Sequence, residues 1–549
     1  MAPTVLVIGL DGGTFNLIKP FIQQGFLTNI HKLMSHGTTR VLKSTIPPVS
    51  PPAWTSFLTG INPGGHSIFQ FVEMDVKDYS FTRNRLINST LYSGKTFIDS
   101  ISNHGLKVGI VKIPFTYPPW PVNGIMIAGE PSPDWKKAHT YPPELAQNIG
   151  RVNKGSATDF LRYNTQELLA HLKFDCHVRT QLTRDLMKTG HYDFFMMVHN
   201  VTDAAIHRFW KFTDTTCPNY KGRFKKHEHL IREVYQAVDD SVGQILNDVD
   251  DDTTVFLMSD HGATRKPLYF FHINAWLREN GYLKIRNSNS GAQNLFKFLA
   301  WMKGNIPPLL RQVIMRILKS HFQRWLSKFE TRATNFQWDE TKAYAVNLYT
   351  CIDGIAINLK GRQEQGIVEP GATAEKMCCD LKAQLLEVKD PRTNTRIIKN
   401  VFSRHEVFIG PYAQKMPELI LEYAPDYRSG KQTNPPLVSD VPKTDFDFQS
   451  GDHDPEGIFI ATGTHIKPNC QLSPATIQDM APTLLYAMGL PVPDNMDGQV
   501  MTDIFDEAFV RQHPVHSVAQ NKERNHLELS LSQTDEDEMI KQLKGLGYM

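Results

Sequence analysis

The first 270 residues alternate short, continuously apolar runs with longer segments whose apolar residues recur at helical spacing. The apolar runs predict strands, and the helical spacing predicts helices between them. Strands that are buried on both faces have such unbroken apolar runs, so the pattern predicts an α/β fold with a doubly wound, mainly parallel sheet flanked by helices. The predicted strands are Val5–Leu10, Val108–Ile113, Gly124–Ala128, Phe194–His199 and Thr254–Met258, and the predicted helices are Phe26–His36, Leu161–Leu172, Thr180–Lys188 and Leu230–Val249.

The pattern changes over residues 285–335, which are predicted to form a helical insertion. Two amphipathic segments, Leu295–Lys303 and Leu309–Leu326, are separated by a Pro-Pro step. Residues 292–329 carry many Lys and Arg residues and no acidic residue. We expect a cap that packs on the main domain with solvated lysines; the alternative is peripheral contact with a membrane or another anionic partner.

The remainder of the chain returns to the α/β pattern. The catalytic domain is expected to be discontinuous, with residues 1–270 and 340–510, followed by a tail at 511–549 that ends in a surface helix over Asp535–Gly547. A Pro/Ser/Asp-rich loop at Asn434–Ser450 is expected to shape the pocket together with the insertion. Further predicted strands are Ala343–Leu348, Ile352–Leu359 and Gly457–Ala461, and further helices are Ala374–Glu387 and Ile477–Met488.

The composition is that of an ordinary globular chain. Of the 549 residues, 41% are hydrophobic and 21% are charged, and 59 Lys and Arg against 57 Asp and Glu give a formal net charge of +2. This balance gives no support to nucleic-acid binding. No run reaches the roughly 18 apolar residues that a membrane span needs. The segment after Met1 reads as a core strand, and six scattered cysteines lack a CxxC pair, so a cytoplasmic location is expected.

Candidate chemistry is concentrated where predicted strands end. Asp11 follows the first strand and precedes a Gly-Gly turn, and Asp260 and His261 follow the strand Thr254–Met258. Asp203 comes shortly after Phe194–His199. In parallel sheets the site lies outside the carboxyl ends of the strands, so these carboxylates are expected on one edge. Taken alone, an aspartate such as Asp11 is equally well explained as a solvated turn residue that caps a helix.

Three further residues complete the set. Asp203 and His207 are four apart, which places them on one face of a helix, as two ligands of one metal or as a plain surface pair. Ser50 precedes a Pro-Pro step and a helical run, which is typical of a nucleophile, or of a capping serine, at a helix N-terminus. His453 lies in a polar segment that reads as a loop before a strand.

In this order the motifs resemble the alkaline phosphatase superfamily, and within it the type I phosphodiesterase/nucleotide pyrophosphatase branch, over most of the chain. The resemblance implies that Asp203, His207 and His453 hold one metal ion. It also implies that Asp11, Asp260 and His261 hold a second, towards which Ser50 bridges. Such ligands suit Zn²⁺, and Mn²⁺ is a credible substitute. Flanking segments that carry the resemblance are Phe57–Gly60, Pro63–Phe69, Asn274–Arg278, Gly354–Gly361 and Asp479–Leu485.

The resemblance implies a hydrolase of small phosphate esters. A phosphodiesterase or nucleotide pyrophosphatase would act through Ser50 and a phosphoseryl-type intermediate, with two cations about 4 Å apart at the attacking and leaving oxygens. Two positions depart from the family pattern. Many members have threonine at the position of Ser50, and Ala53 stands where an asparagine helps to hold the phosphate. Lys112 and Asn200, which follow strands, are candidate substitutes for that contact.

Several other functions compete with this interpretation. A phosphomonoesterase shares the same ligands, and a membrane-associated phospho-group transferase would use the basic segment 292–329. A sulfatase is less well supported, because Trp54 stands where the maturation motif needs arginine. A non-enzymatic scaffold is disfavoured, because all seven predicted site residues are intact.

Overall fold

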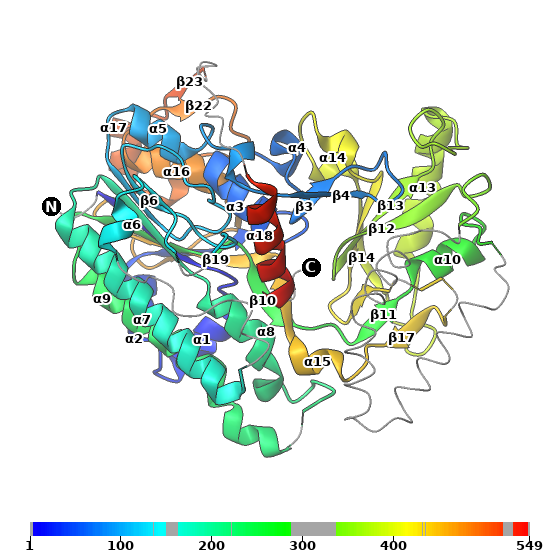
Figure 1. Cartoon of the computed structure of the whole chain (residues 1–549), viewed down its shortest axis with the longest axis horizontal. Coiled ribbons are helices and arrows are strands. Elements are labelled where there is room, and N and C mark those ends of the chain that lie inside the picture. Colours follow the sequence, from blue (N-terminus) through cyan, green and yellow to red (C-terminus); the bar gives the residue numbers. More distant parts are fainter. Residues whose placement is uncertain are drawn as a thin grey trace.

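Figure 1 shows the computed structural model of the chain. It describes residues 4–134, 137–149, 163–220, 222–286, 336–430, 432–433, 435–519 and 531–546. The predicted helical insertion at 285–335, with its basic segment 292–329, therefore lies outside the described residues except for its first two positions.

A ten-stranded sheet forms the centre of the larger lobe. Its middle strands run parallel, each made of the apolar residues that a strand buried on both faces requires. The prediction of a doubly wound, mainly parallel sheet flanked by helices is confirmed. In spatial order these strands are β9 (Thr254–Met258), β1 (Val5–Leu10), β8 (Phe194–His199), β5 (Val108–Val111) and β6 (Gly124–Ile127).

Alternate residues of each central strand enter two different cores. In β1, Val5 and Val7 pack into one core, and Leu6 and Ile8 pack into the other. The first core is covered by α3 (Ser50–Thr59), α5 (Phe97–Asn103) and α16 (Met480–Ala487), and the second by α2 (Thr28–His36), α7 (Thr165–Thr189) and α9 (His229–Leu246). The sheet therefore has helices on both faces.

Helix α7 differs from its prediction, because it is one continuous helix where the sequence predicted two. Polar residues around Asp175 interrupt the apolar pattern there. The structure shows that Arg179 is buried and that its Nε lies 2.8 Å from Asp175 Oδ2, an i,i+4 ion pair within the helix.

Two antiparallel strands extend the sheet beyond β9. They are β19 (Glu456–Thr462), which pairs with β9, and β2 (Thr38–Lys43), which pairs with β19. The predicted late core strand Gly457–Ala461 lies within β19. The segment expected as a loop at Asn434–Ser450 contains a short strand, β17 (Val438–Asp440), and one helical turn, α15 (Asp445–Phe448).

A second lobe has its own sheet and its own core (Figure 1, right). This four-stranded antiparallel sheet packs against helix α13 (Ala372–Leu386). The sequence did not separate this core from the catalytic domain. Its strands, in spatial order, are β12 (Ala343–Tyr349), β13 (Ile352–Ile357), β15 (Leu419–Tyr423) and β14 (Ile398–Ser403).

The C-terminal helix α18 (Gln533–Leu546) crosses the middle of the view in Figure 1. It was predicted as a surface helix, but Met539 and Leu543 are buried in the first core. Its polar side chains bind loops of the larger lobe, among them Gln542 with Ser132 and Glu538 with the backbone of Asp134. Among the described helices, none combines the length and the apolar character that crossing a bilayer would require.

Candidate metal and nucleophile site

Two strand ends bring Asp11 and Asp260 together. Asp11 follows β1 directly, and Asp260 follows the neighbouring strand β9 after one residue. Between them Gly12 adopts a φ of 67°, and its N–H donates to Asp260 Oδ1 over 3.2 Å. A Cβ at Gly12 would lie 3.2 Å from Asp203 Oδ1, so this turn needs glycine both for its backbone and for its neighbour.

Helix α8 (Val201–Thr213) begins just after β8 and carries Asp203 and His207 on one face. His207 Nε2 lies 3.3 Å from Asp203 Oδ1. His453 Nε2 lies 3.4 Å from the same oxygen and 3.1 Å from His207 Nε2. The three atoms predicted to hold one ion therefore converge on one point.

His453 was expected in a loop, but it lies on the short strand β18 (Gly451–Asp454). This strand pairs with β10 (Gly262–Arg265), with His453 opposite Ala263. Its sequence, Gly-Asp-His-Asp, has no apolar alternation, so nothing local predicts a strand. The pairing places His453 beside His261, and their rings stack with centroids 3.8 Å apart.

The second predicted group also converges. His261 Nε2 lies 3.5 Å from Asp11 Oδ1 and 3.4 Å from Asp260 Oδ2. Ser50 Oγ lies 3.5 Å from the same nitrogen. Ser50 is the first residue of α3, and it is buried. Its hydroxyl lies beside His261, and the N-cap position of α3 is taken by Val49, so Ser50 is not the capping residue of this helix.

Backbone carbonyls fix the three histidine rings. His207 Nδ1 lies 3.1 Å from the carbonyl oxygen of Gly451, His261 Nδ1 2.9 Å from that of Gly262, and His453 Nδ1 2.9 Å from that of Pro48. A carbonyl can only accept, so these contacts favour the tautomer that carries the proton on Nδ1 and turns the Nε2 lone pair to the site. Nδ1 of His207 also lies 3.1 Å from Gln449 Nε2. Metal-binding histidines are oriented in this way.

The electrostatics favour cations. Burial raises the pKa of Asp11 well above its ordinary value, and the charges of Asp260 and Asp203 raise it further. Burial also raises the pKa of Asp260 to about 8 and lowers the pKa of His261 to about 3. Around Asp203, burial is outweighed by His207 and His453, which hold its pKa well below its ordinary value. Burial would lower the pKa of His207, but Asp203 outweighs it and raises that pKa. Crowded, desolvated carboxylates such as Asp11 and Asp260 are stabilised by a bound cation.

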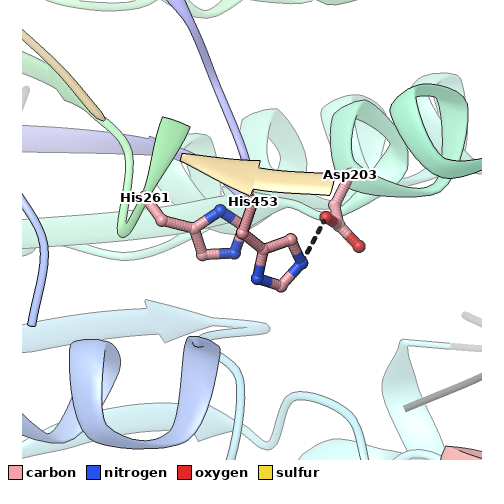
Figure 2. Close-up of side chains that lie close together, drawn as sticks. All are labelled: Asp203, His261 and His453. Carbon is pink, nitrogen blue, oxygen red and sulfur yellow. Dashed lines mark ion pairs between the residues drawn. The ribbon is translucent and has the colours of Figure 1, made fainter. Parts of the chain in front are cut away.

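The donor set fits metal ions. Among the described residues, Asp11 Oδ1 and Asp260 Oδ2 are buried and accept no hydrogen bond. Asp11, Asp260 and His261 offer ligand atoms within 4.8 Å of one another, and so do Asp203, His261 and His453. His261 belongs to both groups because its ring stacks on His453, as Figure 2 shows together with the Asp203–His453 ion pair. The two groups therefore adjoin, as two neighbouring cations require.

Lys112 and Asn200, the two candidate phosphate contacts, both bind Glu130 instead. Lys112 Nζ lies 3.3 Å from Glu130 Oε1, and Asn200 Nδ2 lies 3.5 Å from Glu130 Oε2. Arg179 contacts both oxygens of the same carboxylate. We call Lys112, Glu130, Arg179 and Asn200 the Glu130 cluster.

The Glu130 cluster was missed by sequence reasoning. Lys112 follows β5, Glu130 lies beyond β6 and Asn200 follows β8, so the cluster occupies the same sheet edge as the predicted ligands. Burial would raise the pKa of Glu130, but Arg179 and Lys112 outweigh it and lower that pKa to about 2. Ala53, where the family pattern has asparagine, is fully buried.

Comparisons with known proteins agree with this site. A sequence model of the family described as type I phosphodiesterase/nucleotide pyrophosphatase matches residues 5–456. No curated protein matches the sequence.

Two solved structures of murine ectonucleotide pyrophosphatase/phosphodiesterase 5 are similar to this chain. The first has a TM-score of 0.48 at 9% identity, and the match covers 92% of this chain and 100% of that chain. The second, an inactive form in complex with AMP, has a TM-score of 0.48 at 10% identity with the same coverage. The assignment rests on the family match, which spans most of the sequence and contains every predicted site residue. The chain belongs to the type I phosphodiesterase/nucleotide pyrophosphatase family of phosphoric ester hydrolases.

Proposed function

We propose that the protein is a two-metal phosphodiesterase or nucleotide pyrophosphatase that uses Ser50 as its nucleophile. One observation carries this proposal. Three histidines place Nδ1 2.9 to 3.1 Å from backbone carbonyl oxygens and turn Nε2 towards three buried carboxylates, and the hydroxyl of Ser50 lies 3.5 Å from one of those Nε2 atoms. Imidazole and carboxylate ligands favour Zn²⁺, with Mn²⁺ as an alternative.

The residues divide into two ligand sets. Asp203, His207 and His453 would hold one ion, and Asp11, Asp260 and His261 the other, with Ser50 beside the second set. When bound, such ions supply Lewis acidity, which lowers the pKa of a nearby hydroxyl and neutralises charge on phosphate oxygens.

Ser50 performs the covalent chemistry. Its Oγ forms a bond to phosphorus as the bond from phosphorus to the leaving oxygen breaks, which gives a phosphoserine and a free alcohol or nucleotide. The proton of Ser50 is lost to solvent, and the leaving oxygen takes one up. The intermediate still carries the other ester group of the substrate. Water then attacks phosphorus, the bond from phosphorus to Ser50 Oγ breaks, and a phosphate monoester leaves as the hydroxyl is regenerated. The position of Ser50 at the start of α3 supports this role through the helix dipole, which favours an anion there. The amides contribute little, because Pro51 and Pro52 have no N–H and the N–H of Ala53 donates to the carbonyl of Val49.

The decisive experiment compares a diester with a monoester. The protein is loaded with zinc or with manganese, and kcat/KM is measured for bis(4-nitrophenyl) phosphate and for 4-nitrophenyl phosphate. We expect the diester to be preferred by at least about 10-fold, which corresponds to about 1.4 kcal/mol of transition-state binding. A strong preference for the monoester would overturn the proposal in favour of a phosphomonoesterase.

A further inference from the structure

The second lobe reaches the metal-ligand set through one aromatic ring. Tyr349 is the last residue of β12, where the pairing with β13 shifts register after Asn347. Its ring centroid lies 5.1 Å from that of His453, with 30° between the ring planes. His453 thus contacts Tyr349 as well as His261, whose ring stacks on it at 3.8 Å. The ligand ring therefore packs against side chains from two other segments.

Tyr349 also connects the two lobes. It packs against the first core of the larger lobe and against the core of the second lobe. The strand behind it is anchored in the second lobe, where Tyr344 packs on Trp338 with centroids 5.0 Å apart. Because β12 is held by its own sheet, the position of the Tyr349 ring is set by the second lobe.

Two kinds of contact restrict the torsion next to the imidazole of His453. Its Nδ1 lies 2.9 Å from the carbonyl oxygen of Pro48, and because Nδ1 is off the rotation axis this contact opposes rotation of the ring. The rings of His261 and Tyr349 restrict the same rotation further, and rotation would move Nε2 away from Asp203 and His207. The torsion next to an imidazole ring is broad, so packing must fix the ring plane.

We infer that Tyr349 is a positioning residue, through which the second lobe holds His453 in the plane that binds the ion shared with Asp203 and His207. This inference rests on the proposed two-metal function. The aromatic ring performs this role. The phenolic hydroxyl bonds to the side chain of Asp452, the residue before His453, and its contribution is measured separately by Tyr349→Phe. Loss of the ring weakens one of the two metal sites and leaves the other unaltered. Groups that orient metal-binding histidines contribute about 10- to 100-fold to affinity.

Zinc titration of the metal-free protein, in competition with a chromogenic chelator, tests this inference. The variants are Tyr349→Leu, which removes the ring but keeps most of the apolar volume, and Tyr349→Phe, which keeps the ring. Tyr344→Leu is the matched control, because it removes the same kind of ring from the same strand without contact to His453.

We expect Tyr349→Leu to raise one of the two dissociation constants by about 10-fold or more, and the other to stay within about 2-fold. Tyr349→Phe and Tyr344→Leu should keep both within about 3-fold of the wild type. The rise in Tm on adding zinc depends on the affinity of the folded protein for the ion, so it can be measured even if part of a sample is unfolded. This rise should be smaller in Tyr349→Leu and unchanged in the other two variants.

Two results would overturn the inference: wild-type affinities in Tyr349→Leu, or an equal loss in Tyr344→Leu. A wild-type protein that binds fewer than two ions would instead contradict the proposed function on which the inference rests.

Discussion

Buried carboxylates lie at two places along the edge where the parallel strands of the central sheet end, and their pKa values are shifted in opposite directions. At the ends of β9 and β1, Asp260 and Asp11 have no buried lysine or arginine bonded to them among the described residues, and their pKa values are raised. At the ends of β5 and β6, Glu130 is bonded to Lys112 and Arg179, and its pKa is lowered to about 2. Lys112 and Arg179 neutralise Glu130 at one end, whereas Asp11 and Asp260 at the other end would need metal ions from solution.

The difference teaches how the site is divided. A buried carboxylate that is paired with a Lys or Arg is already neutralised. A group of buried carboxylates without such a partner is stabilised when a metal ion binds. The carboxylate at the Glu130 end is therefore neutralised by side chains of the protein itself. The carboxylates at the other end would be neutralised by the proposed metal ions.

The largest effect is expected at the metal end, from Ser50→Ala. Without the nucleophile, kcat should fall by at least about 10³-fold, while the protein keeps its bound metal. Steady-state kinetics and elemental analysis of the same sample measure both quantities. Ser56→Ala is the matched control, because this hydroxyl lies on the same helix but contacts His66 Nε2 over 2.9 Å. Near-normal turnover in Ser50→Ala would exclude Ser50 as the nucleophile.

The next largest effect concerns pH and distinguishes the two ends directly. In the metal-free protein the pKa of Asp260 is about 8 against an ordinary 3.8. Between these values the folded state binds more protons than the unfolded chain, so stability falls as the pH rises from about 4 to 8. Urea unfolding at pH 5 and pH 8 should show that the wild type loses more stability than Asp260→Asn over this interval, by more than about 1.4 kcal/mol, the equivalent of one pKa unit. The comparison between the two proteins cancels the opposite contribution of His261, whose pKa is lowered to about 3.

Variants at each end separate these contributions. Asp260→Asn should reduce this pH dependence. Glu130→Gln should preserve it, because the contribution of Glu130 is complete above its ordinary pKa of 4.5 and is lost only as the pH falls towards 2. Equal pH dependence in the wild type and in Asp260→Asn would refute the assignment of the titration to the metal end.

A smaller effect is expected in the Glu130 cluster. Lys112→Met removes one of the two cations that neutralise Glu130, and the loss should cost about 3 kcal/mol in the free energy of unfolding. The double variant Lys112→Met/Glu130→Gln leaves Arg179 paired with Asp175 and should cost less than the sum of the two single changes. Chemical denaturation of the four proteins measures this coupling, and strict additivity would show that the two side chains do not interact.

The smallest effect is expected from the C-terminal helix, which supports the Glu130 end. The side-chain amide of Gln542 binds both the N–H and the carbonyl of Ser132, two residues after Glu130. Gln542→Ala should lower stability by about 1 to 2 kcal/mol, because it leaves buried backbone groups without partners. Gln533→Ala, at the exposed start of the same helix, is the control. A loss of the same size in both variants would show that the contact to Ser132 contributes nothing specific.

The sequence signals for the predicted ligands at the metal end are local. Asp11 and Asp260 follow apolar strands, and Asp203 and His207 have helical spacing, so each residue is placed by its immediate neighbours. Topology then brings them together, since parallel strands end at one edge. The resemblance to a known family supplied the division into two ligand sets, and it placed His453, which has no such local signal.

The Glu130 cluster and the second lobe could not be predicted in this way. Arg179 lies in the middle of a long helix, 49 residues from Glu130, and no spacing rule connects the two. Tyr349 likewise reaches His453 only through the packing of a separate sheet. Such contacts depend on tertiary structure and leave no pattern in the neighbouring residues.

The number of metal ions bound per chain tests the account most directly. Elemental analysis of protein purified with zinc should give close to two ions per chain, and His453→Ala should lower this number to close to one. A wild-type protein that binds no zinc or manganese, or a His453→Ala variant that still binds two ions, would contradict the account.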